Sequence, residues 1–445
     1  MHTLNSHLIL ADYNQTYAMA VRGEGIYVFD ETGRDYIDGS GCTAAVTHLG
    51  HGDTVIAEAV AEQARTLATH PTHLFHSPIV EQYFERLLQF APDGFSRAWT
   101  ISGGTEAVEN AIKLAYQYHR AKGRQGRKRV IGRWSSYHGN SILTLNVGGL
   151  VNRRSYYTDL MADQHLHVSP CLPYRRPAEQ SVQEYEDGLV AEFARAVAEH
   201  PDEIAAFIAE PVVGSALGAG VPTQNYFARI AEICRAHDIV MIADEVMTGF
   251  GRTGRNFGCE HFGTHADILT CAKGISGGYV PLGAILVREH IAQTLRESGD
   301  PFFSGQTYSC IPLAAATGLA VLNRIEELGL VQNSAEVGAY LLEQLQTQLD
   351  LPVVGEVRGL GLFLGVEFVA DRQTKAILPP ERMFFKRVQN ACLEAGLTVM
   401  AARGTVDSRM GDHLLLAPPL IMDRADADEL THRLAAGIRA AAATL

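Results

Sequence analysis

The chain has 445 residues, of which 47% are hydrophobic and 20% charged, and its formal net charge at pH 7 is −13. This composition is that of a globular protein, and the length favours two domains over one core. The acidic balance, without a long run of Lys or Arg, argues against nucleic-acid and anionic-membrane partners. No apolar run approaches the roughly 18 residues of a membrane span. Scattered cysteines without a C-x-x-C motif, and an N-terminus without a signal-peptide pattern, predict a cytoplasmic protein.

Apolar runs alternate with helical patterns through the middle of the chain. Short strands come first, in GEGIYVFDETGRDYIDGSG (23–41), around a turn at Thr32-Gly33. Beyond them, the spacing of apolar residues predicts strands at 98–101, 130–131, 205–209, 239–243, 268–272 and 284–287, and helices at 105–122 and 226–238. Strands that alternate with helices in this way form a mostly parallel sheet flanked by helices. The expected fold class is therefore α/β.

The pattern changes after about residue 310. Long helices are predicted over 310–347, strands return in 352–369 and 413–422, and an amphipathic helix closes the chain at 424–445. Together with the strand-rich first 45 residues, this predicts two domains. A large α/β domain covers 50–310, and a smaller α+β domain is built from both termini, 1–49 and 311–445.

Residues that follow the predicted strands are the first candidates for a site, because ligands bind beyond the carboxyl ends of strands in open α/β sheets. Each has an ordinary structural explanation, such as a helix start, a packed aromatic ring or a surface charge. Together they would bring an anion site, an aromatic face, a carboxylate and an amine to one rim. They are Ser102–Glu106, Tyr137–Gly139, Glu210-Pro211, Asp244–Val246 and Lys273-Gly274.

A cofactor that carries a phosphate, a pyridine ring and an aldehyde would need such a set. A glycine-rich helix start, as at 103–105, offers backbone N–H groups to a phosphate. A carboxylate such as Asp244 raises the pKa of a neighbouring ring nitrogen and so keeps it protonated. An amine such as Lys273 can bond to the aldehyde and then act as acid and base. Tyr137 and Val246 can pack on the two faces of the ring.

Seven stretches, in this order within residues 20–435, resemble the class III (subgroup II, omega-type) aminotransferases, which are pyridoxal-phosphate enzymes of fold type I. They are SGGTEAVENAIKLA, SSYHGNS, AAFIAEPVVGSALG, IADEVMTGFGRTG, LTCAKGISGGYVPLGA, GQTYSCIPLAAATGLAVL and GDHLLLAPPLIM. The resemblance implies pyridoxal 5'-phosphate as the cofactor. It also implies an amine or omega-amino-acid donor, a keto acid such as pyruvate or 2-oxoglutarate as acceptor, and a homodimer with active sites at the interface.

The same resemblance implies roles for single residues. Asp244 pairs with the pyridine nitrogen, Lys273 bonds to the aldehyde, and Thr307 reaches the phosphate of the neighbouring subunit. The full set of expected cofactor-binding residues is Gly103, Gly104, Thr105, Tyr137, His138, Gly139, Glu210, Asp244, Val246, Lys273 and Thr307. No metal is expected.

The implied chemistry is a transamination in two halves. A donor displaces Lys273, whose amine then moves a proton from the substrate Cα to the cofactor, and a keto acid reverses the steps. Three same-fold reactions stay open because they begin in the same way: racemisation or epimerisation, aminomutation and decarboxylation. A catalytically silent cofactor-binding protein and a nicotinamide-dependent oxidoreductase are more distant alternatives.

Gly249, Gly251 and Gly254 spell the G-x-G-x-x-G pattern that is associated with dinucleotide binding. A true fingerprint follows its strand at once and opens a helix. Here DEVMT intervenes and no helical periodicity follows. We therefore expect these glycines to shape a loop beside the active site.

Two histidine groups and one serine are weak candidates for other chemistry. His70, His73 and His76 are interrupted by Pro71, and Cys259, His261 and His265 show no recognised zinc spacing. Ser102 has no G-x-S-x-G context, so a serine hydrolase is unsupported.

The substrate carboxylate should be bound by an arginine, whose planar guanidinium matches it. Many members of the family carry a mobile arginine just before the GD of GDHLLLAPPL, and Ser408 occupies the expected position. Arg403 or Arg409 could take its place, or either could be a surface charge. Thr43, with Ala44 and Ala45, stands where members often have bulky aromatics, which predicts a roomier pocket.

Overall fold

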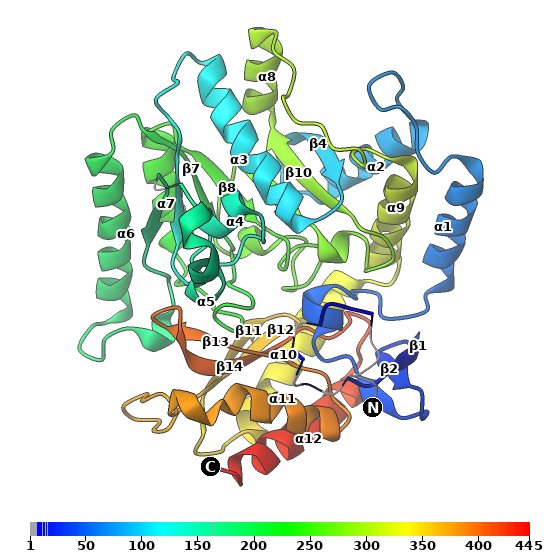
Figure 1. Ribbon diagram of the computed structural model, residues 1–445, viewed down its shortest axis with the longest axis vertical. Helices are drawn as coiled ribbons and strands as arrows, with labels where there is room; N and C mark the ends of the chain where they lie inside the picture. Colours follow the sequence, from blue (N-terminus) through cyan, green and yellow to red (C-terminus); the bar gives the residue numbers. More distant parts are fainter. Residues whose placement is uncertain (1–6, 11, 14, 16, 163) are drawn as a thin grey trace.

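The structure is a computed structural model that describes residues 7–10, 12, 13, 15, 17–162 and 164–445. A seven-stranded sheet occupies its upper half in Figure 1. The strand order is β4-β10-β9-β8-β7-β5-β6, and β10 alone runs antiparallel to its neighbours. The expected mostly parallel sheet is confirmed. Its strands are β4 (Phe95–Ile101), β5 (Arg129–Arg133), β6 (Leu166–Val168), β7 (Ile204–Ala209), β8 (Val240–Asp244), β9 (Ile268–Cys271) and β10 (Gly283–Arg288).

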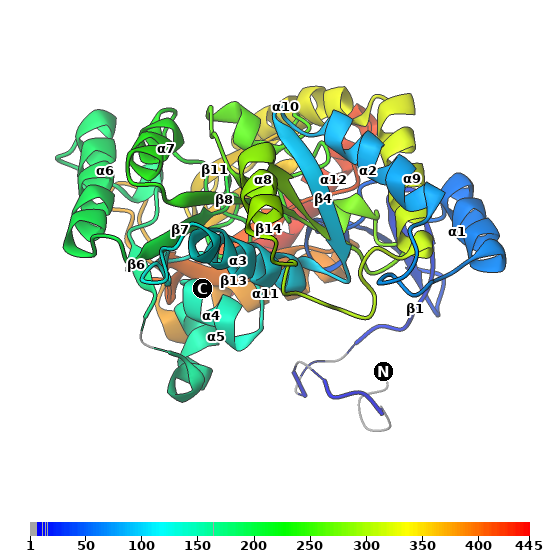
Figure 2. The ribbon, with the colours of Figure 1, turned by 90° about the horizontal axis from the view of Figure 1, so that it is seen from above.

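Helices cover both faces of this sheet (Figure 2). Along β7, Ala206 and Ile208 pack in the core on the side of α3, whereas Phe207 packs on the side of α6 and α7. This alternation explains why the central strands read as unbroken apolar runs. The helices around the sheet are α3 (Gly104–Ala121), α4 (Ile142–Val147), α5 (Val151–Arg154), α6 (Val182–Glu199), α7 (Tyr226–Ala236) and α8 (Glu289–Ser298).

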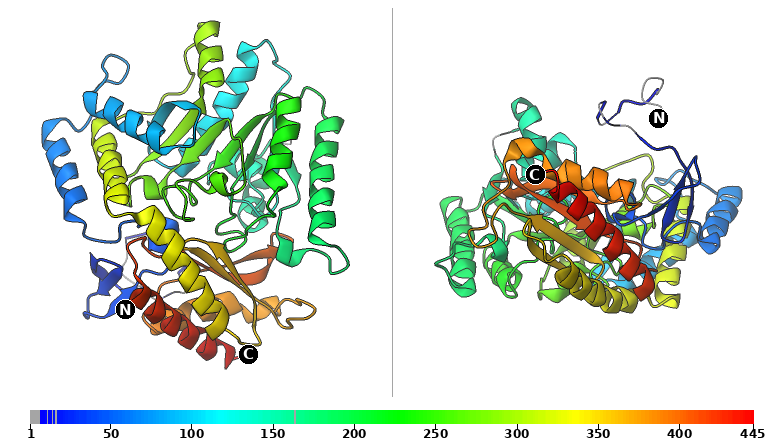
Figure 3. Two further views of the ribbon diagram at one scale, coloured as in Figure 1. Left: turned by 180° about the vertical axis from the view of Figure 1, so that it is seen from behind. Right: turned by 90° about the horizontal axis from the view of Figure 1, so that it is seen from below.

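A helical group lies beside the β4 edge of the sheet. There α9 packs against α1 and α2, and α2 packs against β4. The bounds are α1 (Thr54–Thr66), α2 (Pro78–Phe90) and α9 (Pro312–Glu327). From α9 the chain passes into the lower half of the molecule, as the view from behind in Figure 3 shows.

The lower half contains a four-stranded antiparallel sheet in the order β11-β12-β14-β13. Three helices accompany it: α12 packs against α10 and α11, α10 packs against β11, and α11 packs against β13. The bounds are β11 (Val354–Leu360), β12 (Phe363–Phe368), β13 (Met400–Val406), β14 (Met410–Leu416), α10 (Leu330–Gln348), α11 (Phe384–Glu394) and α12 (Arg424–Ala442).

The N-terminal strands join this lower half. β1 (Ala20–Glu24), β2 (Tyr27–Asp30) and β3 (Asp35–Ile37) form an antiparallel sheet. The Ile37 N–H donates to the Gly396 carbonyl at 2.9 Å, and the Ala417 N–H donates to Gly39 at 2.8 Å. Both ends of the chain are thus hydrogen-bonded to each other. The boundaries at 50 and 310 stay predictions, and residues 1–6, 11, 14 and 16 of the small domain lie outside the described residues.

Among the described residues, none of the helices combines the length and the apolar character needed to cross a bilayer.

Candidate active site

Three charged side chains lie at neighbouring strand ends of the seven-stranded sheet. Asp244 ends β8, Glu210 directly follows β7, and Lys273 follows β9 by two residues. Because β7, β8 and β9 are parallel neighbours, these residues line one cavity of about 160 Å³. All predicted cofactor residues except Gly103 and Thr307 line it. The lining is Gly104, Thr105, Tyr137, His138, Gly139, Glu210, Ser215, Asp244, Val246, Met247, Ala272 and Lys273.

The start of α3 forms one wall of the cavity. Gly103 is its N-cap, and a β-carbon at Gly104 would lie only 3.0 Å from Val246 Cγ1. At Gly139, whose φ is +133°, a β-carbon would lie 2.7 Å from Thr105 Oγ1. Side chains at these positions would fill the wall. The glycines therefore leave the N–H groups at the start of an 18-residue helix open to an anion.

Asp244 is held in place by two hydrogen bonds. Its Oδ1 accepts from the Val246 N–H at 3.1 Å, and its Oδ2 lies 2.7 Å from His138 Nδ1. Both side chains are almost fully buried. Burial disfavours the charged imidazole, but the carboxylates of Glu210 and Asp244 outweigh it and raise the pKa of His138. The short contact between His138 Nδ1 and Asp244 Oδ2 therefore fixes the orientation of the Asp244 carboxylate.

Glu210 lies on the other side of His138. Its Oε1 accepts from the Tyr137 N–H at 3.0 Å, and Arg133, almost fully buried, approaches Oε2 at 3.5 Å. Glu210 Oε2 and His138 Nε2 are 3.9 Å apart. Neither of these buried atoms has a hydrogen-bond partner in the described part of the chain. Such orphaned groups are costly in a stable core, so they mark a place where a ligand completes the structure.

Lys273 has the left-handed backbone conformation, with φ +54°, which is uncommon for a residue with a side chain. Burial lowers its pKa to about 8 against the opposing attraction of Asp244 and Glu210. Within the described residues, its ammonium has no hydrogen-bond or ion-pair partner. A neutral, unpaired amine is the form that attacks a carbonyl carbon.

The neighbouring carboxylate, Glu245, has a structural role. It is fully buried and accepts hydrogen bonds from the N–H groups of Gly258, at 2.9 Å, and Cys259, at 2.7 Å. Thr248 also donates to it. Glu245 therefore fixes the loop after β8, and Asp244 alone of this pair lines the cavity.

The glycine pattern at 249–254 forms turns that open no α-helix and are followed only by the short 3-10 helix η4 (Gly258–His261), so it is not a dinucleotide fingerprint. Arg252, within this loop, is fully buried and donates to the carbonyl of Leu362 at 2.9 Å and to that of Pro418. It also lies 3.3 Å from His48 Nδ1. A β-carbon at Gly254 would meet the backbone of Ala335 at 2.9 Å. The pattern thus serves close packing beside the site.

The weak metal candidates do not assemble. Within the described chain, no three His, Cys, Asp or Glu side chains are grouped to hold a metal ion. His73 and His76 are exposed. His261 contacts the Thr253 carbonyl at 3.0 Å, and Cys259 is buried in the core.

The three predicted substrate residues lie outside the cavity. Arg403 is bound to Asp412 at 2.8 Å and stacks on Phe385, so its guanidinium is already occupied. Arg409 lines a different cavity, of about 660 Å³. Thr43 is exposed on the turn η1 (Gly41–Ala45).

Ser408 and Thr307 also lie away from the cavity. Ser408 is buried, and its hydroxyl lies 2.7 Å from that of Ser135. Thr307 is exposed on the loop between α8 and α9.

The sequence matches the class III aminotransferase family over residues 9–438. It is 36% identical over 432 residues, 96% of each chain, to the uncharacterised aminotransferase YodT of Bacillus subtilis. It is 32% identical over 429 residues to the putrescine–pyruvate aminotransferase of Pseudomonas aeruginosa, covering 94% of this chain and 91% of that one. The omega-transaminase of Pseudomonas jessenii, solved in complex with PMP, has a TM-score of 0.89 and 33% identity, with coverages of 96% and 93%. The chain therefore belongs to the class III aminotransferases, enzymes that transfer an amino group from an amine or amino acid to a keto acid.

Sequence reasoning missed four residues at or beside the site. Ser215, Met247 and Ala272 line the cavity, and each lies within a stretch that already resembled the family. Arg153 has no such signal. Its guanidinium carbon lies 5.3 Å from the centre of the Tyr137 ring, a contact that only the folded chain reveals.

Proposed function

We propose that this aminotransferase binds pyridoxal 5'-phosphate in the cavity at the ends of β7, β8 and β9. The observation that carries the proposal is the placement of Lys273 and Asp244 on one cavity, with Asp244 oriented by His138. The residues present fit this cofactor. They offer an open helix start for the phosphate, an anion for the ring nitrogen and an unpaired amine for the aldehyde.

Each group has a defined task in this scheme. The bound cofactor supplies an electron-accepting ring that stabilises negative charge on the substrate carbon. The N–H groups at Gly104 and Thr105 bind the phosphate, and Tyr137 and Val246 enclose the ring. Asp244 keeps the ring nitrogen protonated. Lys273 takes the proton from the substrate carbon next to nitrogen and delivers it to the carbon on the other side of that nitrogen.

We propose a homodimer whose interface includes the loops around Thr307 and Phe75. Large apolar side chains are exposed there: Phe75 is 60% exposed, Phe303 67% and Tyr308 63%. Phe75 and Cys310 line the same cavity of about 680 Å³, so the two loops share one face. Apolar groups gathered in this way favour a protein partner. Thr307, exposed between them, would reach the phosphate in the second subunit.

The remaining proposals concern domains and compartment. We propose residues 50–310 as the cofactor-binding domain, with the small domain made from 1–49 and 311–445. All seven cysteines are free thiols, which supports a reducing cytoplasmic environment.

A panel of amino donors, run with pyruvate and 2-oxoglutarate in parallel, tests the function. The purified holoenzyme should be yellow, a donor should bleach its visible absorbance, and a keto acid should restore the colour. Amino acid and carbonyl product should form in equal amounts. A protein that binds the cofactor but forms no amino acid from either keto acid, with any donor, contradicts the proposal. A donor that only changes its configuration, without an acceptor, would indicate a racemase.

A further inference from the structure

The cavity at the ends of β7, β8 and β9 is small. Its volume is about 160 Å³, whereas sites for small molecules commonly measure roughly 300–1,000 Å³. A substrate that reacts with a cofactor bound there would extend beyond the residues that line this cavity. Tyr137 belongs to the lining, and its ring is partly buried. A side chain that contacts this ring without lining the cavity is placed next to the part of the substrate that extends beyond it.

Arg153 is such a side chain. It lies on the short helix α5, is exposed, and places its guanidinium carbon 5.3 Å from the centre of the Tyr137 ring. Burial raises the pKa of Tyr137, and the positive charge of Arg153 opposes this larger effect. The guanidinium and the phenol therefore interact electrostatically. No carboxylate of the described residues forms an ion pair with Arg153. All of its donors are therefore available to a ligand, while the aromatic ring limits the orientations of the guanidinium.

Two neighbouring arginines are engaged in other contacts. Arg154 stacks on Trp134 and lies 3.2 Å from His167 Nε2. Arg133 is almost fully buried and donates to the Glu210 carbonyl at 2.6 Å.

The arginines of the β13–β14 hairpin are also directed away from the cavity. Arg403 is paired with Asp412. The Asn152 side chain donates to the Arg409 carbonyl at 3.3 Å, so the hairpin packs on α5, but the Arg409 side chain lines the other cavity.

We propose that Arg153 binds the carboxylate of the keto acid acceptor, and so determines the preference for anionic acceptors over neutral aldehydes. This proposal rests on the proposed function and deepens it. Arginine suits the task because its two parallel N–H groups match the two oxygens of a carboxylate. An exposed cation beside a residue of the cavity lining also attracts anionic substrates to a protein whose net charge is −13 and would otherwise repel them.

The experiment separates the carboxylate from the rest of the acceptor. Enzyme loaded with pyridoxamine phosphate is mixed with pyruvate, or with acetaldehyde, which is pyruvate without its carboxylate, and recovery of the visible absorbance is followed. In Arg153→Ala the second-order rate constant with pyruvate should fall about 10- to 100-fold, as expected for a lost charge-assisted contact. The rate constant with acetaldehyde should change less than about twofold. Arg153→Lys, which keeps the charge but not the planar fork, should lie between.

Controls distinguish the possible failures. Arg195→Ala removes the same charge from an exposed position on α6 and should leave both rate constants unchanged. Equal rate constants with pyruvate in Arg153→Ala and the wild type would overturn the role of Arg153 while leaving transamination intact. So would a selective loss in Arg409→Ala alone. A wild-type enzyme that regains no colour with either acceptor would instead refute the proposed function.

Discussion

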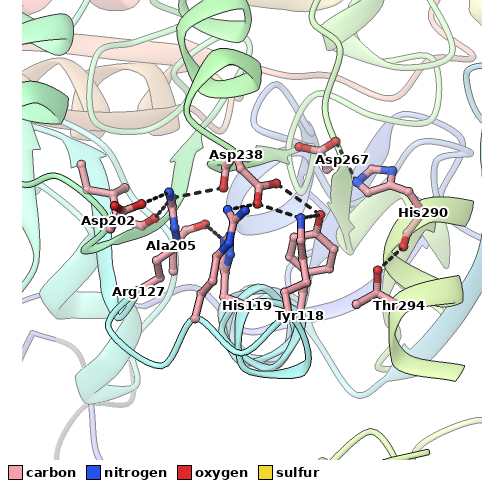
Figure 4. Close-up of polar contacts among 12 residues, drawn as sticks. Tyr118, His119, Arg127, Asp202, Ala205, Asp238, Asp267, His290 and Thr294 are labelled. Atoms are coloured by element: carbon pink, nitrogen blue, oxygen red, sulfur yellow. Dashed lines mark hydrogen bonds and ion pairs between the residues drawn. The ribbon is translucent and has the colours of Figure 1, made fainter. Parts of the chain in front are cut away.

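The seven-stranded sheet carries similar residues at the two ends of its parallel strands, but their charges are paired at one end and unpaired at the other. We call these two sides the amino edge, where the parallel strands begin, and the carboxyl edge, where they end. At the amino edge (Figure 4), the carboxylate of Asp238 pairs with Lys122 at 2.7 Å and with Arg124, and it accepts from the Tyr118 hydroxyl at 3.3 Å. Burial raises the pKa of Asp238, but the hydrogen bond from Lys122 and the nearby positive charges outweigh burial and lower the pKa. At the carboxyl edge, Lys273 is an unpaired amine. Ion pairs stabilise the amino edge. The carboxyl edge instead retains Lys273, whose side chain has no hydrogen-bond or ion-pair partner among the described residues.

The same contrast holds for histidine. His119, at the amino edge, is buried and lies 2.9 Å from the Ala205 carbonyl (Figure 4), and burial lowers its pKa to about 4. His138, at the carboxyl edge, is equally buried, yet its pKa is raised by two carboxylates. Burial alone therefore does not mark a functional histidine. The sign of the surrounding charge distinguishes His119 from His138, which contacts the Asp244 carboxylate in the cavity.

Lys273→Ala, at the carboxyl edge, should have the largest effect on transamination. Without the amine, transamination with any donor should fall by at least ~1,000-fold, because no other group in the cavity replaces its proton transfer. The absorbance band of the covalently bound cofactor should also disappear. Unfolding by denaturant, measured on the apoprotein, checks that the fold is retained. A variant with normal colour and rate would exclude Lys273 from the chemistry.

Asp244→Asn should have the next largest effect. The amide keeps the shape and one hydrogen bond but lacks the charge that we propose holds a proton on the ring nitrogen, so turnover should fall about 100-fold or more. Single-turnover absorbance measurements, at saturating cofactor, separate this loss from weaker binding. Turnover within twofold of the wild type would contradict the assigned role.

The pH dependence of cofactor attachment should report the pKa of Lys273. Its pKa of about 8 means that the ammonium dominates below pH 8 and the reactive amine above it. The rate at which apoprotein takes up pyridoxal phosphate should therefore rise roughly tenfold per pH unit below pH 8 and level off above it. Stopped-flow absorbance from pH 6 to 9.5 measures this profile. A profile that still rises steeply from 9 to 9.5 would show an ordinary lysine.

Asp238→Asn should have the smallest effect, on stability alone. The variant keeps a residue that tolerates the left-handed backbone at this position, where φ is +50°, but loses the charge that Lys122 and Arg124 contact. Because these side chains are partly exposed, we expect a loss of only about 0.5–1 kcal/mol in unfolding free energy. Urea denaturation of the apoprotein measures it. A large fall in transamination rate would show that the two edges are coupled.

The sequence allowed the carboxyl edge to be predicted because strand ends can be read from apolar runs. Asp244 and Lys273 each follow such a run, and parallel pairing of β8 and β9 brings them together. The reversed direction of β10 could not be read in this way, since an apolar strand looks the same in either orientation. The Tyr137–Arg153 contact depends on how α4 packs against β5 and α5 against α4, which no local pattern records.

Local reasoning cannot see the partners of two predicted residues. Arg403 has the residue type that binds a carboxylate, but a nearby acid, Asp412 on the paired strand, already occupies it. The partner that we propose for Thr307 is the phosphate site of a second copy of the chain, which local sequence cannot show. Both cases depend on contacts between segments distant in sequence or in separate molecules.

The pairing of the two chain ends has a consequence for biosynthesis. Ser40 and Thr398, whose hydroxyls lie 3.2 Å apart, are 358 positions apart in sequence. At translation rates of 5–20 residues per second, the early strands wait about 20 to 70 seconds for their neighbours to be made. During that interval the backbone groups of Ile37 that later bond to Gly396 and Thr398 have no such partners in the nascent chain.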